Sequence, residues 1–283
     1  MKLRSLLFVP GDRPDRFAKA AASGADAIII DLEDSVGLDR KIVAREAAAE
    51  YLSGDRPVPV FVRVNPQDSN LTHDDLASVL PYVPDAIVLP KAEGARSINW
   101  LRAEAAAVAD SQDGEAPLIL PIATETPGAV FDLGTLREVA HYLAGVSWGA
   151  EDLPASVGAV TAREVDGSYT APYEMVRSLT LFAAHAAGVS AIDTVFPNIS
   201  DAAGLSAYVA RAARDGFNGM LAIHPSQVAS INAGFTPSPA QLAHAQSIVD
   251  AFAANPGAGV LQIGGKMIDA PHLKAALSIL KRV

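Results

Sequence analysis

Charged side chains follow the short apolar runs of this sequence again and again. Arg63 lies near the end of one run, Lys91 follows the next, and Glu125 and Asp152 follow two later runs. A single charged residue at a strand end commonly reaches solvent or caps the next helix. A set of such residues that converges on one edge of a sheet instead builds a site for a charged ligand.

The carboxylates in this set predict a site for a hard divalent cation. Around one small opening, mutual repulsion raises the pKa of neighbouring carboxyl groups unless a cation neutralises them, and the carboxylates concerned are Asp31, Glu33, Glu125, Glu151 and Asp152. Mg²⁺ binds one or two carboxylates together with waters and substrate oxygens, and Mn²⁺ accepts the same ligands. The absence of cysteine argues against zinc. We expect Glu125 and Asp152 to be the ligands; the alternative is that they pair with Arg63 or Lys91.

Two cationic residues indicate how an anionic substrate would be held. Arg63 lies within the run FVRVN, where a guanidinium needs an anionic partner and its fork suits a substrate carboxylate. With a metal ion, it can hold a 2-oxo or 2-hydroxy acid and polarise its carbonyl, as enolate chemistry requires. Lys91 could bind an anion or form a Schiff base. We favour anion binding, because neighbouring carboxylates keep the pKa of a lysine high.

Apolar runs and Ala-rich segments alternate along the chain and must position these residues. The expected strands are 6–9, 27–32, 58–64, 86–89, 118–123, 143–148, 191–195 and 220–223. The expected helices are 14–22, 40–52, 74–80, 95–109, 127–140, 173–187, 201–215 and 225–233. This pattern predicts an α/β fold, a (β/α)8 TIM barrel whose active residues lie at the carboxyl ends of the strands. A doubly wound open sheet is the alternative, but no Gly-rich dinucleotide turn follows the first run.

The chain continues beyond the eighth unit, further than a barrel requires. We predict a catalytic barrel at residues 1–235 and a C-terminal helical extension at residues 236–283. The extension is expected to contain helices at 238–255 and 271–280, joined by a Gly-rich turn at 256–265.

Composition excludes several classes of protein. The chain of 283 residues carries 22 Lys+Arg against 32 Asp+Glu, a net charge of −10, which argues against binding to nucleic acid or to anionic lipid. No apolar run reaches the roughly 18 residues of a membrane span, and the N-terminal run is too short for a signal peptide. We therefore expect a cytoplasmic protein that acts on a small molecule.

An ordered set of motifs resembles the citrate lyase β-subunit-like family, within the HpcH/HpaI aldolases and the malyl-CoA and citramalyl-CoA lyases. The resemblance covers nearly the whole chain, and its motifs are LLFVPGDRPDRFAKA, IIIDLEDSV, KIVAR, FVRVN, IVLPKAEGA, PIATETPGAV, WGAEDLPASVG, GFNGMLAIHPSQV and GGKMIDAPHLKAA. A single motif such as LPK would be weak, but their order along the chain is specific.

The resemblance implies a metal-dependent lyase that cleaves or forms a carbon–carbon bond next to a carbonyl. Glu125 and Asp152 match the residues that hold Mg²⁺, and Arg63 matches the substrate-binding arginine. Asp269, in the motif MIDAP, matches a catalytic acid/base that the tail of a neighbouring subunit supplies. The family therefore implies a homotrimer, or a multiple of it, in which the extension completes another subunit's site.

The resemblance also implies that the protein binds coenzyme A. Basic residues of the first loop and of the first two helices are candidates for nucleotide contacts, namely Arg13, Arg16, Lys19, Lys41 and Arg45. The alternative is a solvated basic face. Asp15 stands where some relatives have a lysine, which puts full retention of the CoA contacts in doubt.

The expected substrate is a 3-hydroxy-acyl-CoA such as citryl-, citramalyl- or malyl-CoA, cleaved to a CoA thioester and a 2-oxo acid. Two alternatives remain: a CoA-independent class II pyruvate aldolase, and a citrate lyase β subunit that depends on partner subunits.

Overall fold

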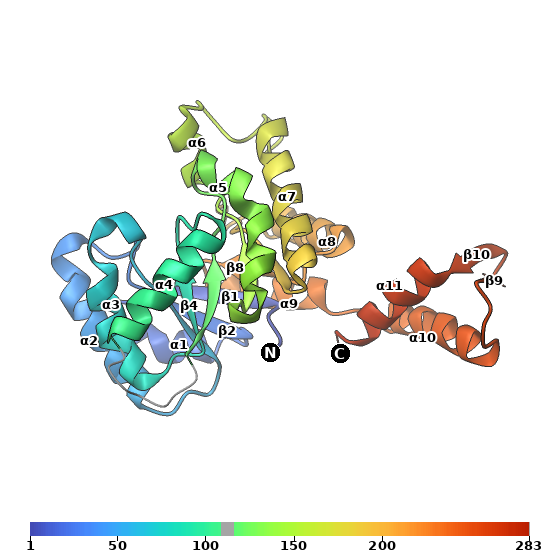
Figure 1. The fold of residues 1–283 in the computed structure, drawn as a ribbon, viewed down its shortest axis with the longest axis horizontal. Coiled ribbons are helices and arrows are strands. Elements are labelled where there is room, and N and C mark those ends of the chain that lie inside the picture. The colour runs from blue at the N-terminus through green and yellow to red at the C-terminus, as the bar shows by residue number, and fades with distance from the viewer. Residues whose placement is uncertain (109–115, 283) are drawn as a thin grey trace.

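A barrel of parallel strands forms the body of the protein. The computed structural model describes residues 1–108 and 116–282. Its parallel strands are β1 Ser5–Pro10, β2 Ala27–Asp31, β3 Val60–Arg63, β4 Ala86–Leu89, β5 Leu118–Pro121, β6 Gly145–Ser147, β7 Ser190–Asp193 and β8 Gly219–Ala222. Helices follow the strands on the outside (Figure 1), namely α1 Phe17–Ala21, α2 Lys41–Ser53, α3 Thr72–Val79, α4 Gly94–Val108, α5 Pro127–Asp132, α6 Asp152–Val157, α7 Ala171–Ala187, α8 Ala202–Asp215 and α9 Pro225–Phe235.

The strands run in the order β5-β4-β3-β2-β1-β8-β7-β6, with each hydrogen-bonded to the next. Two isolated parallel bridges, Ile119 to Leu143 and Ile122 to Ser147, connect the β5 region to the β6 region. The sheet therefore closes on itself, and the predicted (β/α)8 barrel is confirmed in preference to an open sheet.

Alternation of side chains along each strand fills two separate cores. Ile29 and Phe61 point into the barrel, where they belong to one buried cluster. Their neighbours Ile28 and Ile30 point outward and join the larger cluster between strands and helices. Because both faces of every strand are covered, the strands read as continuous apolar runs in the sequence.

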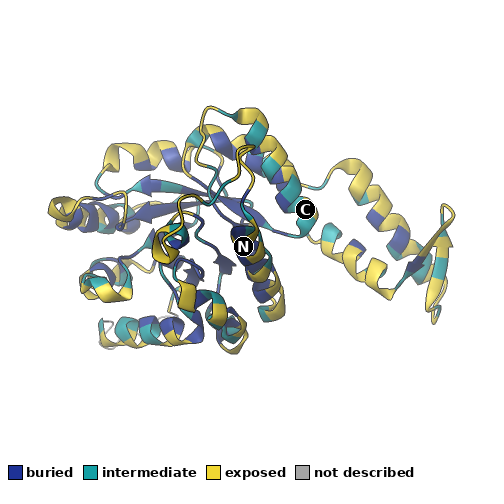
Figure 2. Ribbon diagram, turned by 90° about the horizontal axis from the view of Figure 1, so that it is seen from above, coloured by how far each residue is buried: buried dark blue, intermediate teal, exposed yellow. Residues whose placement is uncertain are grey.

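The C-terminal extension forms a small unit with a core of its own. It consists of α10 Pro239–Ala254, a hairpin of β9 Val260–Ile263 and β10 Lys266–Asp269, and α11 Ala270–Leu280. Its buried residues are Ala245, Ile248, Ile268 and Ala276. Figures 1 and 2 show it to one side of the barrel, joined to α9 by a short segment.

Several expected elements differ from those observed. The turn expected at 256–265 contains β9, because the glycines that suggested a loop form the tip of the hairpin, where Gly264 and Gly265 have positive φ. The helix expected at 127–140 is α5 followed by the 3-10 segment η5 Leu133–Tyr142, which is kinked at Val139. Helix α6 was not predicted. Ala109 and Val283, the expected ends of one helix and of the extension, lie outside the described residues.

Four further 3-10 segments lie in the connections, namely η1 Pro14–Arg16, η2 Leu38–Arg40, η3 Gln67–Ser69 and η4 Leu80–Tyr82. In the described part of the chain, no helix is both long enough and apolar enough to cross a membrane.

Candidate active site

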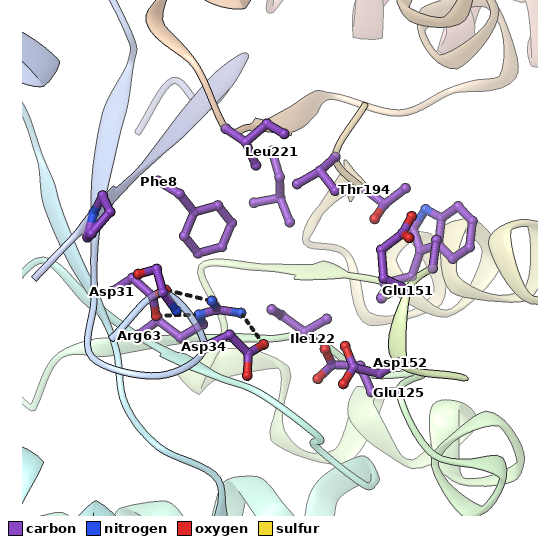
Figure 3. A pocket seen from close by; sticks show the side chains of 17 residues that line it. Phe8, Asp31, Asp34, Arg63, Ile122, Glu125, Glu151, Asp152, Thr194 and Leu221 are labelled. Carbon is purple, nitrogen blue, oxygen red and sulfur yellow. Dashed lines mark hydrogen bonds and ion pairs between the residues drawn. The ribbon is translucent and has the colours of Figure 1, made fainter. Parts of the chain in front are cut away.

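A pocket opens at the carboxyl ends of the barrel strands, where charged side chains from several strands converge. Its volume is about 400 Å³, enough for a small organic acid. The lining residues are Phe8, Pro10, Asp31, Asp34, Ser35, Arg63, Ile122, Glu125, Trp148, Gly149, Ala150, Glu151, Asp152, Thr194, Val195, Leu221 and Ile223. Figure 3 shows Arg63 on one side of the pocket and the carboxylates of Glu125 and Asp152 on the other.

Arg63, the last residue of β3, is held by a carboxylate from the neighbouring strand. Its Nε and Nη2 donate to Oδ1 and Oδ2 of Asp31, both at 2.7 Å. Burial alone would lower the pKa of Arg63, but the charge of Asp31 raises it above its ordinary value. The guanidinium is therefore permanently charged and fixed in orientation.

The remaining edge of this guanidinium faces other anions. Nη1 of Arg63 lies 3.0 Å from Oε2 of Glu33 and 3.7 Å from Oδ2 of Asp34, and the ring of Phe8 lies 4.7 Å from Cζ. The Asp34 side chain is exposed, so a substrate carboxylate can take its place without breaking the buried pair with Asp31.

Glu125 and Asp152, the predicted metal ligands and called the metal pair from here on, occupy the opposite side of the pocket. Glu125 is buried, and the loop after β6 packs so closely on it that a Cβ added to Gly149 would lie 2.4 Å from its Cγ. Burial is the main reason that the pKa of Glu125 rises to about 8; the backbone N–H of Lys91 opposes this, and the charges of Asp152 and Glu33 add to it. Of the two alternative partners, Arg63 pairs instead with Asp31, Glu33 and Asp34. Lys91 does contact both carboxylates, through its backbone N–H to Glu125 and its Nζ to Asp152.

The chemistry of the metal pair fits a hard divalent cation. A carboxyl group whose pKa is raised by burial, and further by a neighbouring carboxylate, is stabilised in its charged form by a cation. Within the described ranges there is no cluster of three or more His, Cys, Asp or Glu side chains arranged to hold a metal. Two carboxylates beside an open pocket match Mg²⁺ or Mn²⁺, which leave coordination positions for water and substrate.

Lys91 contacts Glu33 on the Arg63 side of the pocket and both carboxylates of the metal pair. Its φ of 50° lies in the left-handed region, and its backbone N–H donates to Oε2 of Glu125 at 2.5 Å. Its Nζ donates to Oε1 of Glu33 at 2.9 Å and lies 3.7 Å from Oδ1 of Asp152. Burial lowers the pKa of Lys91, but the bond to Glu33 and the surrounding carboxylates raise it above the ordinary value. A lysine in this state is a poor nucleophile, which supports anion binding over a Schiff base.

Lys41 and Arg45 lie inside the protein, at odds with their predicted contact with coenzyme A. Nζ of Lys41 donates to the carbonyls of Leu32 and Glu33 and to Oδ1 of Asn65, so all three of its protons are used. Nε of Arg45 donates to the buried Asp75 at 2.7 Å. Both side chains therefore hold helix α2 against the barrel, and we assign them to the scaffold.

The other basic candidates are exposed. Arg13, Arg16 and Lys19 lie on the surface near the start of α1. Arg13 is paired at 2.9 Å with Asp15, the residue that departs from some relatives. Contact with coenzyme A remains a prediction for these residues.

Asp269 does not line the pocket of its own chain. It precedes α11 in the extension, where His272 pairs with it at 2.5 Å. The hydrogen bond from His272 lowers the pKa of Asp269, so its carboxylate is ionised at neutral pH.

Phe8, Trp148 and Thr194 are among the pocket residues that the sequence did not identify as site residues. Phe8 and Trp148 lay inside expected apolar strands, and Thr194 lay inside another. A continuous apolar run does not show which of its side chains face the pocket. The only available signal for Phe8 is that successive side chains of β1 point alternately into and out of the barrel.

A family model for "HpcH/HpaI aldolase/citrate lyase" matches residues 4–225, most of the chain. The chain belongs to this family. A citrate lyase subunit beta-like protein of Mycobacterium tuberculosis is 36% identical over 277 residues, covering 98% of this chain and 94% of the relative. The mitochondrial citramalyl-CoA lyase of Homo sapiens is 31% identical over 287 residues, covering 96% and 83%.

Solved structures of the family agree with the barrel fold. The crystal structure of the protein CitE from Mycobacterium tuberculosis, in complex with magnesium, acetoacetate and coenzyme A, matches with a TM-score of 0.81 at 33% identity. The match covers 99% of this chain and 97% of that chain. The predicted resemblance to the citrate lyase β-subunit-like family is thus confirmed.

Proposed function

We propose that this protein is a Mg²⁺-dependent carbon–carbon lyase that cleaves or forms a 3-hydroxy-acyl-CoA, such as citramalyl-, malyl- or citryl-CoA. The products of cleavage are a CoA thioester and a 2-oxo acid. One observation carries the proposal: an arginine fixed by Asp31 and an acidic metal pair face each other across one pocket. The proposal is supported by the relatives, which include a citramalyl-CoA lyase and a structure with magnesium, acetoacetate and coenzyme A.

The oxo-acid half of the substrate is bound between Arg63 and the metal pair. Nη1 of Arg63 binds the carboxylate in place of the exposed Asp34, and Lys91 adds positive charge nearby. Glu125 and Asp152 would hold the divalent cation, which would supply Lewis-acid stabilisation of negative charge that develops on the substrate. Mn²⁺ suits the same oxygen ligands as Mg²⁺.

Cleavage moves one proton and breaks one bond. The 3-hydroxyl group loses its proton, the carbon–carbon bond breaks, and its electron pair moves to the thioester half, which takes a proton at carbon. We assign proton transfer to Asp269, whose lowered pKa suits a proton acceptor. Because Asp269 lies in the extension, outside the pocket of its own chain, we assign it to the site of a neighbouring subunit in a homotrimer.

The CoA moiety is expected over the first two loops, near Arg13, Arg16 and Lys19. These exposed cations give the acidic protein a local positive surface for an anionic substrate. Pairing with Asp15 reduces the charge available from Arg13.

Turnover of an acyl-CoA panel by the purified single chain tests the proposal. Citryl-, citramalyl- and malyl-CoA are incubated with Mg²⁺, and release of the 2-oxo acid is followed. Turnover of a CoA thioester that is abolished by Asp269→Asn is expected. Turnover of pyruvate and a free aldehyde that survives Asp269→Asn would favour the class II aldolase instead. Activity that appears only when partner subunits are added would indicate a dependent β subunit.

The subunit assignment of Asp269 has its own test. Arg63→Lys and Asp269→Asn chains are inactive alone in this account, but when mixed and exchanged they form sites with an intact barrel and an intact tail. About a quarter of wild-type activity should return if subunits exchange at random. No recovery despite demonstrated exchange would place Asp269 in its own chain's reaction or outside the reaction.

A further inference from the structure

A buried carboxylate outside the pocket collects an unusual number of hydrogen bonds. Asp193, the last residue of β7, is fully buried. Its Oδ2 accepts from Nε and Nη2 of Arg177 at 3.0 and 2.7 Å. Its Oδ1 accepts from the Thr194 backbone N–H, from Tyr208 Oη at 3.0 Å, and from Nε1 of Trp148 at 2.7 Å. The proposed reaction uses none of these donors directly.

Trp148 connects this carboxylate to the site. It directly follows β6, its side chain is fully buried, and it also forms part of the pocket lining. Tyr169 packs edge-on against it, with ring centroids 5.1 Å apart. Trp148 is thus held by a charge-assisted hydrogen bond at one end and by an aromatic contact on another side.

The backbone beyond Trp148 carries one half of the metal pair. Gly149, Ala150 and Glu151 lead from Trp148 to Asp152, the first residue of α6. This segment has little freedom: the Gly149 N–H donates to Oγ1 of Thr124 at 3.1 Å, and the Glu125 side chain leaves no room for a Cβ at Gly149. The position of Asp152 relative to Glu125 therefore depends on where Trp148 anchors the start of the segment.

The same tryptophan supports the loop between α6 and α7. Tyr169 Oη accepts from Nη2 of Arg163 at 2.7 Å, and the Arg163 guanidinium lies 4.2 Å from the Tyr169 ring centroid. Nη2 of Arg163 also lies 3.8 Å from Oε1 of Glu151, a residue of the pocket lining. Contacts thus run without interruption from Asp193 through Trp148 and Tyr169 to Glu151 at the pocket.

We propose that Asp193 is a positioning residue that sets the geometry of the metal pair through its hydrogen bond to Trp148. The proposal rests on the proposed function, because it requires Glu125 and Asp152 to bind a divalent cation. It deepens that function by assigning a role in metal affinity to a carboxylate that touches neither substrate nor metal.

Binding of Mn²⁺ alone, measured by calorimetry, tests the proposal without reference to turnover. The test variant Trp148→Phe removes only the indole donor and keeps an aromatic ring. The matched control Tyr208→Phe removes a second donor from the same Oδ1 of Asp193 and keeps the aromatic ring, whose centroid lies 6.5 Å from that of Tyr169. We expect Mn²⁺ to bind about tenfold more weakly to Trp148→Phe, the lower end of the effect of removing a supporting contact around a metal ligand. Tyr208→Phe should bind Mn²⁺ as the unaltered protein does.

Tryptophan fluorescence gives a second readout. The chain has two tryptophans, so Trp100→Phe leaves Trp148 as the only emitter. In that background, Asp193→Asn should shift the emission to longer wavelength and increase quenching by acrylamide, because Trp148 loses its charged anchor. If Asp193→Asn does not fold, Trp148→Phe still decides the question.

The outcomes separate the two proposals. Equal Mn²⁺ affinity in Trp148→Phe and the unaltered protein would overturn the positioning role and leave the metal site intact. An equal loss in Trp148→Phe and Tyr208→Phe would also overturn it, because general loosening of the network would then explain both. Failure of the unaltered protein to bind Mn²⁺ would refute the metal site itself, and the positioning role with it.

Discussion

Protons and the metal ion should compete for Glu125. Burial, with Asp152 and Glu33 adding to it, raises the pKa of Glu125 to about 8 in the metal-free protein, so below that pH a proton must leave before a cation binds. Each pH unit below 8 then lowers the apparent affinity by about tenfold, and at pH 6 it should be roughly 100-fold weaker than above pH 8.

Calorimetric titration with Mn²⁺ between pH 6 and 9 measures this slope. Repeating the titration at pH 7 in buffers with different ionisation enthalpies counts the protons, and release of about one proton per Mn²⁺ is expected. Glu125→Gln should remove both the binding and the slope. Asp34→Asn is the matched control, because it removes a carboxylate from the other side of the same pocket and should keep the slope. An Mn²⁺ affinity that does not change between pH 6 and pH 8 would refute the displacement of a proton from Glu125 by the metal ion.

The same pKa has a consequence for stability. A glutamate whose pKa is raised on folding stabilises the folded state while it is protonated, and this contribution is lost as the pH rises from the unfolded value toward 8. The melting temperature of the metal-free protein should therefore gain most from added Mg²⁺ at pH 8 and above. An equal gain at pH 6 and pH 8, measured by calorimetry at fixed Mg²⁺, would contradict this assignment.

Three further substitutions test the roles assigned to Arg63, Arg45 and Gly149. Arg63→Lys should lower kcat/KM by roughly 100-fold or more, because a lysine cannot hold Asp31 in a fork and still bind a substrate carboxylate; near-normal turnover would argue against this role. Arg45→Ala should lower the free energy of unfolding by about 3–5 kcal/mol in denaturant titrations, since it leaves Asp75 buried without its cation. The KM of the folded variant for acyl-CoA should not change, whereas a large rise would restore the predicted CoA contact. Gly149→Ala should weaken Mn²⁺ binding by about tenfold or more, because its Cβ would press on the metal pair, and unchanged affinity would show that the pair can shift freely.

The sequence predicted the barrel well because the physics of a buried parallel strand is local. A strand covered on both faces is a continuous apolar run, and β2 and β4 were found within one or two residues of their ends. The hairpin in the extension was missed because β9 and β10 are largely exposed and lie beside glycines. Each strand is stabilised by pairing with the other, and neither has the apolar composition of a buried strand.

The site was predicted in its residue types but not in its pairing. That Glu125 and Asp152 follow two successive strands, and that Arg63 lies near the end of an earlier one, could be read from the chain. That Asp31 holds Arg63, and that Lys41 and Arg45 point inward, could not, because a helix turned slightly about its axis exchanges its buried and exposed positions. Whether a basic side chain is exposed depends on how its helix packs, and the neighbouring residues in the sequence do not show this.

The position of a bound cation most directly tests the assignment of Glu125 and Asp152 as metal ligands. Crystals grown with Mn²⁺ and pyruvate, with data collected where manganese scatters anomalously, locate the ion without reference to turnover. We expect a single anomalous peak coordinated by oxygen atoms of Glu125 and Asp152, with the pyruvate carboxylate bound to Nη1 of Arg63 in place of Asp34. A peak among other carboxylates, or pyruvate bound away from Arg63, would contradict it.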